Sequence, residues 1–103
     1  MSSSFPDTDA IYKALAHPVR RDILRWLKSP ETYFPGQTSF SQHGIAAGVI
    51  EARSSLSQST VSLHLSKLQE AGLLVSTRLG RNICYKRCEP AISTFVDRIV
   101  RSI

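Results

Sequence analysis

The stretch LSQSTVSLHLSKLQEAGLLVSTRLGRNICYKR, residues 56–87, contains the two elements that decide the fold of this chain. Ser57 is of the type that caps helix N-termini, and the apolar residues after it recur at the spacing of one helix face. Gly72 can supply the left-handed conformation that ends such a helix. The two runs that follow are rich in β-forming residues and flank the short turn LGRN. The stretch therefore predicts a helix over 58–71 and then a β-hairpin.

Helical patterns surround this stretch. Residues 7–16 have apolar side chains at helical spacing, with Asp7 as the predicted N-cap. Pro18 suits the first turn of a second helix over 18–28. Residues 45–55 have helical composition, although Gly48 weakens the pattern.

The remaining segments are a loop and a final helix. Residues 29–44 contain two prolines and two glycines and predict a long loop. A loop of this length is an accessory insertion, a surface for a partner or a mobile segment. Residues 90–103 carry a nearly complete apolar stripe and predict a C-terminal helix. The predicted fold is mainly α with a small β-hairpin, in the order α-α-α-α-β-β-α, as one domain over residues 1–103.

The charge of the chain is unevenly distributed. The 103 residues have a formal net charge of +5, and hydrophobic and charged contents of 42% and 20% are ordinary for a globular protein. The stretches 1–52 and 89–103 each balance their basic and acidic residues. The excess lies in 53–88, where Glu70 is the one acid among six basic residues: Arg53, Lys67, Arg78, Arg81, Lys86 and Arg87. Such confinement favours a surface that binds a polyanion over a merely solubilising one.

Two short helices joined by a tight turn, the second rich in hydroxyl groups, are typical of a helix-turn-helix. Short hydroxyl and amide side chains can contact base edges or phosphates. Leu63 is apolar on the polar side of its helix, where it could contact a thymine methyl group or a protein partner, or simply be a tolerated surface residue. Arg78 and Arg81 lie at the hairpin tip, where they can follow the DNA backbone or enter the minor groove. Alternatively, they simply protect a solvated sheet edge.

The segments ALAHPVRRDILRWL (14–27) and 56–87 resemble the ArsR/SmtB family of winged-helix transcriptional repressors. The similarity covers most of the chain apart from about residues 29–48. It implies a winged helix-turn-helix with a recognition helix at 57–72 and a wing at 73–88. It also implies a homodimer joined through helices 7–16 and 90–103 that binds a palindromic operator and is released by an inducer, which is a small molecule or a redox signal.

The metal sites of that family are not matched here. The helix before the recognition helix reads IAAGVIEARSS and has no thiol, and the last helix has a single acid, Asp97, and no histidine. Cys84 and Cys88 would be about 13 Å apart on a continuous strand, too far for a disulfide. Two ordinary thiols are favoured, and a redox or metal sensor using them stays open as an alternative.

The second alternative is a protein-interaction module on the same fold, with Trp26, Tyr33 and Phe34 as its surface. No catalytic arrangement, cofactor site or metal site is predicted, so we do not expect an enzyme. The sequence shows neither a secretion signal nor a membrane span, which predicts a cytoplasmic protein without membrane contact.

Two sets of site residues follow from these patterns. The predicted DNA-binding residues are Gln58, Ser59, Thr60, Ser62, Leu63, His64, Ser66, Lys67, Arg78, Arg81 and Lys86. The predicted dimerisation residues form the apolar stripes of the first and last helices: Ile11, Leu15, Ile92, Phe95, Val96, Ile99, Val100 and Ile103. The stripe of the last helix is wider than one small domain needs at its terminus.

Overall fold

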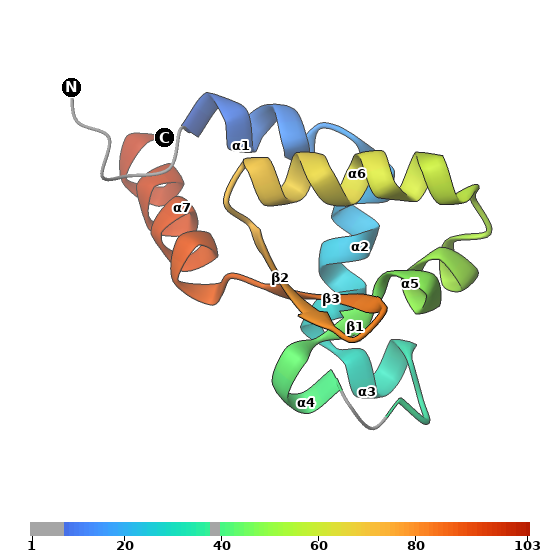
Figure 1. Cartoon of the computed structure of the whole chain (residues 1–103). Helices are drawn as coiled ribbons and strands as arrows, with labels where there is room; N and C mark the ends of the chain where they lie inside the picture. Colours follow the sequence, from blue (N-terminus) through green and yellow to red (C-terminus); the bar gives the residue numbers. More distant parts are fainter. Residues whose placement is uncertain (1–7, 38–39) are drawn as a thin grey trace.

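The computed structural model describes residues 8–37 and 40–103, and Figure 1 shows its helices around a small sheet. Its elements in chain order are α1 (Thr8–Leu15), α2 (Pro18–Lys28), α3 (Pro30–Tyr33), α4 (Phe40–His43), β1 (Ile45–Ala46), α5 (Ala47–Ser54), α6 (Gln58–Glu70), β2 (Leu74–Leu79), β3 (Asn82–Arg87) and α7 (Glu89–Ser102). No helix within the described ranges is long and apolar enough to cross a bilayer.

The predicted fold class is confirmed, but the predicted element order was incomplete. The loop predicted at 29–44 contains two single-turn helices, α3 and α4. The helix predicted at 45–55 begins two residues later, because Ile45 and Ala46 form a third strand. The N-cap predicted at Asp7 lies outside the described residues.

The helices α2 and α6 begin and end at local signals. At the start of α2, Nδ1 of His17 accepts a hydrogen bond from the Val19 N–H at 3.4 Å, and Pro18 occupies the first turn. At the end of α6, the N–H of Gly72 donates to the Gln69 carbonyl and the N–H of Leu73 to the Leu68 carbonyl, which is a Schellman motif. Gly72 takes the left-handed φ of 84° that this motif requires.

The three strands form one antiparallel sheet in the order β1-β3-β2. Ile45 pairs with Tyr85, while Leu79 and Asn82 close the hairpin between β2 and β3. Gly44 precedes β1 at φ 95°, and a Cβ there would overlap the carbonyl group of Tyr85. Glycine is therefore required where this short strand approaches the hairpin.

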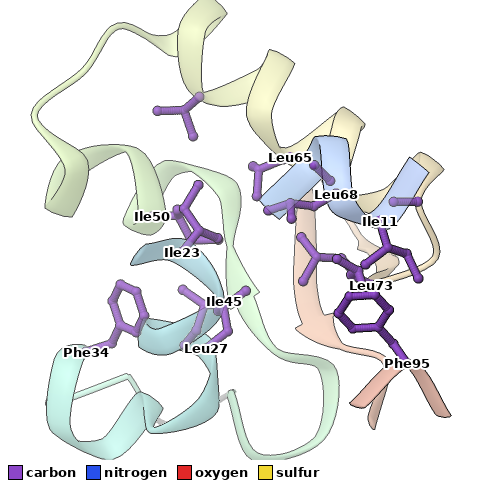
Figure 2. Packing of buried hydrophobic residues seen from close by; sticks show 14 residues of the cluster. Ile11, Ile23, Leu27, Phe34, Ile45, Ile50, Leu65, Leu68, Leu73 and Phe95 are labelled. Carbon is purple, nitrogen blue, oxygen red and sulfur yellow. The ribbon is translucent and has the colours of Figure 1, made fainter. Parts of the chain in front are cut away.

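The core is formed by apolar side chains from nearly every element, and Figure 2 shows most of them. Ile11, Leu68, Leu73 and Phe95 join α1 and α7 to α6 and the start of the hairpin (Figure 2). On the other side the cluster continues through residues of α2, β1 and α5 together with the side chain after α3: Ile23, Leu27, Phe34, Ile45 and Ile50. The core thus holds α6 and the hairpin in fixed positions relative to α2.

The segment after α2 is tied to α5 by one arginine. The guanidinium of Arg53 lies 5.2 Å from the ring centre of Trp26 and 4.9 Å from that of Tyr33. It also donates a hydrogen bond of 3.0 Å to the Tyr33 carbonyl. Arg53 belongs to the basic segment, but its guanidinium is engaged in contacts within the domain.

Candidate DNA-binding surface

The N-terminus of α6 is organised by Ser57. Its Oγ accepts a hydrogen bond from the Thr60 N–H at 3.2 Å and donates one to Thr60 Oγ1 at 2.8 Å. This cap satisfies one of the free amide groups of the first turn. The predicted N-cap is confirmed, and the Thr60 hydroxyl is already engaged in it.

The two faces of α6 differ sharply in exposure. Val61, Leu65 and Leu68 are buried in the core. The opposite face is exposed and carries the small polar side chains together with one leucine: Gln58, Ser59, Ser62, Leu63 and Ser66. The side chain of Leu63 is 53% exposed, so one apolar group lies among the polar side chains of this face.

His64 does not belong to this outer face, which corrects the prediction that it contacts DNA. It is only 4% exposed, and its Nδ1 accepts a hydrogen bond of 3.1 Å from Nε of Arg20. Its ring lies 4.4 Å from that of His17, measured between ring centres. Burial lowers the pKa of His64 below the usual 6.5, and the neighbouring His17 and Arg20 lower it further. His64 therefore joins α6 to α2 as a neutral, buried acceptor.

The wing places its basic residues in different environments. Arg78 and Arg81 are exposed, and neither has an ion pair or side-chain hydrogen bond within the described part of the chain. Nζ of the exposed Lys86 donates to the Gln42 carbonyl at 3.2 Å. Arg87 is different: its side chain is 12% exposed, pairs with Glu89 at 2.9 Å and reaches the Leu24 carbonyl. Arg87 is a structural residue.

The recognition helix and the wing meet around one hollow of about 410 Å³. Gln58 and Ser62 line it from α6, and Arg81 and Asn82 line it from the wing. Asn82 was not among the predicted contacts, although its place in the LGRN turn could have indicated it. The structure thus brings four polar side chains of the basic segment onto one surface.

The predicted dimerisation residues divide into three groups. Ile11 and Phe95, which were predicted to lie in the dimer interface, are instead buried in the core of their own domain, at 1% and 7% exposure. Leu15, Ile92 and Ile99 pack partly against the same core. The exposed residues of the stripe are on α7 and at its end: Val96, Val100 and Ile103, at 52%, 73% and 92%. The sequence missed Tyr12 of α1, which is 43% exposed while its ring contacts Phe95.

Among the residues of the two alternative hypotheses, Cys84 and Phe34 are buried, whereas Cys88, Trp26 and Tyr33 are half-buried. Cys84 is buried, and Cys88 precedes α7 as a second free thiol. Within the described residues no three His, Cys, Asp or Glu side chains are grouped so as to hold a metal ion. Phe34 is buried at 4% exposure, and its ring meets that of Trp26 edge to face.

Comparisons with known proteins agree with this geometry. Residues 50–76, which include α6, match the model of the family described as "Bacterial regulatory protein, arsR family". The HTH-type transcriptional regulator YbzH of Bacillus subtilis (strain 168) is 35% identical over 89 residues, which cover 84% of this chain and 89% of that protein.

A solved structure shares the fold. The ArsR-like transcriptional regulator from Rhodococcus sp. RHA1 superposes with a TM-score of 0.69 over 91% of this chain and 76% of its own, at 22% identity. The predicted family is confirmed. The protein is a transcriptional regulator that binds DNA through a helix-turn-helix, and not an enzyme. The chain therefore belongs to the ArsR family of bacterial regulatory proteins.

Proposed function

We propose that the chain is a repressor that binds a palindromic operator as a homodimer, with α6 in the major groove. The observation that carries the proposal is the exposed face of α6. Gln58, Ser62 and Ser66 expose hydrogen-bonding groups that have no partner within the described residues, and Leu63 lies among them. Donors, acceptors and an apolar group on one helix face match the pattern that base edges present in the major groove.

The wing supplies the contacts that do not depend on sequence. Arg78 and Arg81 extend from the hairpin next to α6, and Lys67 lies on the flank of α6 with 48% of its side chain exposed. Cations in these positions can neutralise phosphates and fix the orientation of α6 on the duplex. We assign Lys86 to the same role.

A second copy of the chain is the proposed partner of the exposed apolar face. Tyr12, Val96, Val100 and Ile103 lie on α1 and α7, and an apolar surface of this kind is stabilised by burial in an isologous interface. Two recognition helices must lie about 34 Å apart to enter successive major grooves. We propose that a dimer in this arrangement covers the operator and so represses transcription, and that a signal releases it.

Selection of bound sites from random DNA, followed by binding measurements at several salt concentrations, tests the proposal. We expect a palindromic site bound at least about 10³-fold more tightly than unrelated DNA. Equal binding to all sequences, with a steep salt dependence, would contradict sequence-specific repression.

A further inference from the structure

A second hollow lies where α1, α2 and α6 meet, away from the wing. Its volume is about 410 Å³, and Ala10, Ala14 and Ala71 line it beside charged residues. Ala14 and Ala71 are themselves buried, so their methyl groups form an apolar floor. Figure 1 shows α1 beside the C-terminal half of α6, which it contacts. The hollow is therefore bounded by elements that also determine where the recognition helix lies.

The charges around this hollow are unbalanced. Lys13, Arg20 and Lys67 line it, with Glu70 as the one acid. Nζ of Lys67 lies 3.7 Å from a carboxylate oxygen of Glu70. Within the described residues, neither Lys13 nor Arg20 forms an ion pair. Three cations thus face a hollow that holds one carboxylate.

Arg20 is oriented for binding by its contact with the buried His64. Nε of Arg20 donates to Nδ1 of His64 at 3.1 Å, which fixes the plane of the guanidinium. The two terminal nitrogens have no hydrogen-bond partner in the described part of the chain. A guanidinium held in this way binds carboxylate or phosphate oxygens through two parallel hydrogen bonds.

We propose that this hollow binds a small organic anion, with its carboxylate or phosphate on Arg20 and its apolar part over the alanines. The three cations favour the anionic group, and the methyl-lined floor favours an organic molecule over an inorganic ion. A bound anion neutralises charge beside Lys67, a proposed phosphate contact, and so weakens DNA binding. This regulatory part rests on the function proposed above, whereas binding to the hollow does not.

Benzoate is a suitable probe, because it combines an apolar ring for the alanine floor with a carboxylate for Arg20, and benzamide is its neutral counterpart. We expect benzoate to shift the backbone amide resonances of Ala10, Ala14 and Ala71 saturably in ¹H–¹⁵N spectra. Benzamide should leave these resonances unchanged. Shifts that are spread over all basic residues, or that are the same with benzamide, would overturn the site.

Three variants locate the binding. Arg20→Gln removes the anion contact, and Ala10→Leu fills the hollow without changing its charge. Both should abolish the saturable shifts, whereas Lys28→Gln, which removes an exposed charge elsewhere, should retain them. Retained binding in Ala10→Leu would overturn the proposal even if Arg20→Gln failed to fold.

Operator binding tests the regulatory step separately. By linkage, saturating benzoate should weaken operator binding of the wild type by at least about fivefold, and Ala10→Leu should lose this response. Ala10→Leu should bind operator normally without benzoate. If Arg20→Gln lowers the salt dependence of DNA binding in the absence of benzoate, the hollow receives a DNA phosphate instead and the proposal is wrong. If benzoate binds but no operator is found, the proposed function fails while the site stands.

Discussion

His64 illustrates how the environment of one side chain sets its chemistry. On an exposed helix face a histidine can offer hydrogen bonds to a ligand. His64, in contrast, is buried where α6 packs against α2. Its Nδ1 must stay unprotonated to accept the Arg20 hydrogen bond, because a protonated imidazole has no acceptor. The contact between these helices therefore depends on the protonation state of one ring.

This dependence predicts a loss of stability in mild acid. The pKa of His64 is lowered in the folded state, mainly by burial, so the unfolded chain binds more protons as the pH falls through 6.5. The stability that neutral His64 provides is present above pH 6.5 and is lost progressively toward its folded pKa. Urea unfolding at pH 7.5 and 5.5 measures the loss, which His64→Gln should reduce and His43→Gln should not. An equal loss in His64→Gln would show that another group is responsible.

A second prediction at the scale of the residue concerns Leu63. If its exposed side chain contacts a thymine methyl group, replacing that thymine by deoxyuridine should cost the wild type about 1 kcal/mol, or roughly fivefold in affinity. Leu63→Ala should lose a similar amount on the normal site and be insensitive to the replacement. Anisotropy titrations with the four combinations form a double-mutant cycle. Independent effects of the two changes would exclude this contact.

At the scale of the element, the sheet depends on a close approach that sequence patterns do not reveal. Gly44→Ala should destabilise the fold by more than the roughly 1–3 kcal/mol of a strained backbone, because its Cβ also overlaps the Tyr85 carbonyl. Gly36→Ala is the matched control, since Gly36 has a similar φ of 89° and no atom within 4 Å of the added Cβ. Urea unfolding of both variants separates the two costs. Equal losses of stability in the two variants would mean that β1 shifts away from β3 at little cost in free energy.

The wing allows a comparison within one element. Arg81→Ala should weaken binding to all DNA sequences and lower the slope of log affinity against log salt by about one, as expected for one lost phosphate contact. Arg87→Ala should leave that slope unchanged and lower the stability instead, because Arg87 is bonded within the domain. Salt titrations and urea unfolding of both variants measure the difference. An unchanged slope in Arg81→Ala would remove the wing tip from the proposed DNA contacts.

At the scale of the whole molecule, the exposed apolar face of α1 and α7 predicts a dimer. Val100→Glu places a charge on a side chain that is 73% exposed in the single chain, so the domain should still fold. Within an interface the buried carboxylate would be unpaired and costly, and we expect a monomer with at least about tenfold weaker operator binding. Sedimentation measures the mass, with the exposed Thr32→Glu as the control. A dimeric Val100→Glu that binds normally would place the interface elsewhere.

The sequence by itself determined the elements that depend on near neighbours. The bounds of α2, the cap at Ser57, the end of α6 at Gly72 and the hairpin all follow from signals a few residues apart. A capping side chain, a left-handed glycine and an apolar period act within one or two turns of the chain.

Only the tertiary structure decided which of these residues are free to bind. The two residues of β1 become a strand because β3, almost forty positions later, supplies their hydrogen bonds. His64 and Arg87 are held inside the domain by hydrogen bonds to α2, from Arg20 to His64 and from Arg87 to the Leu24 carbonyl. Ile11 and Phe95 are buried in the core that α1 and α7 share. Periodicity gives the face of a helix on which a side chain lies, but its burial depends on which distant element covers that face.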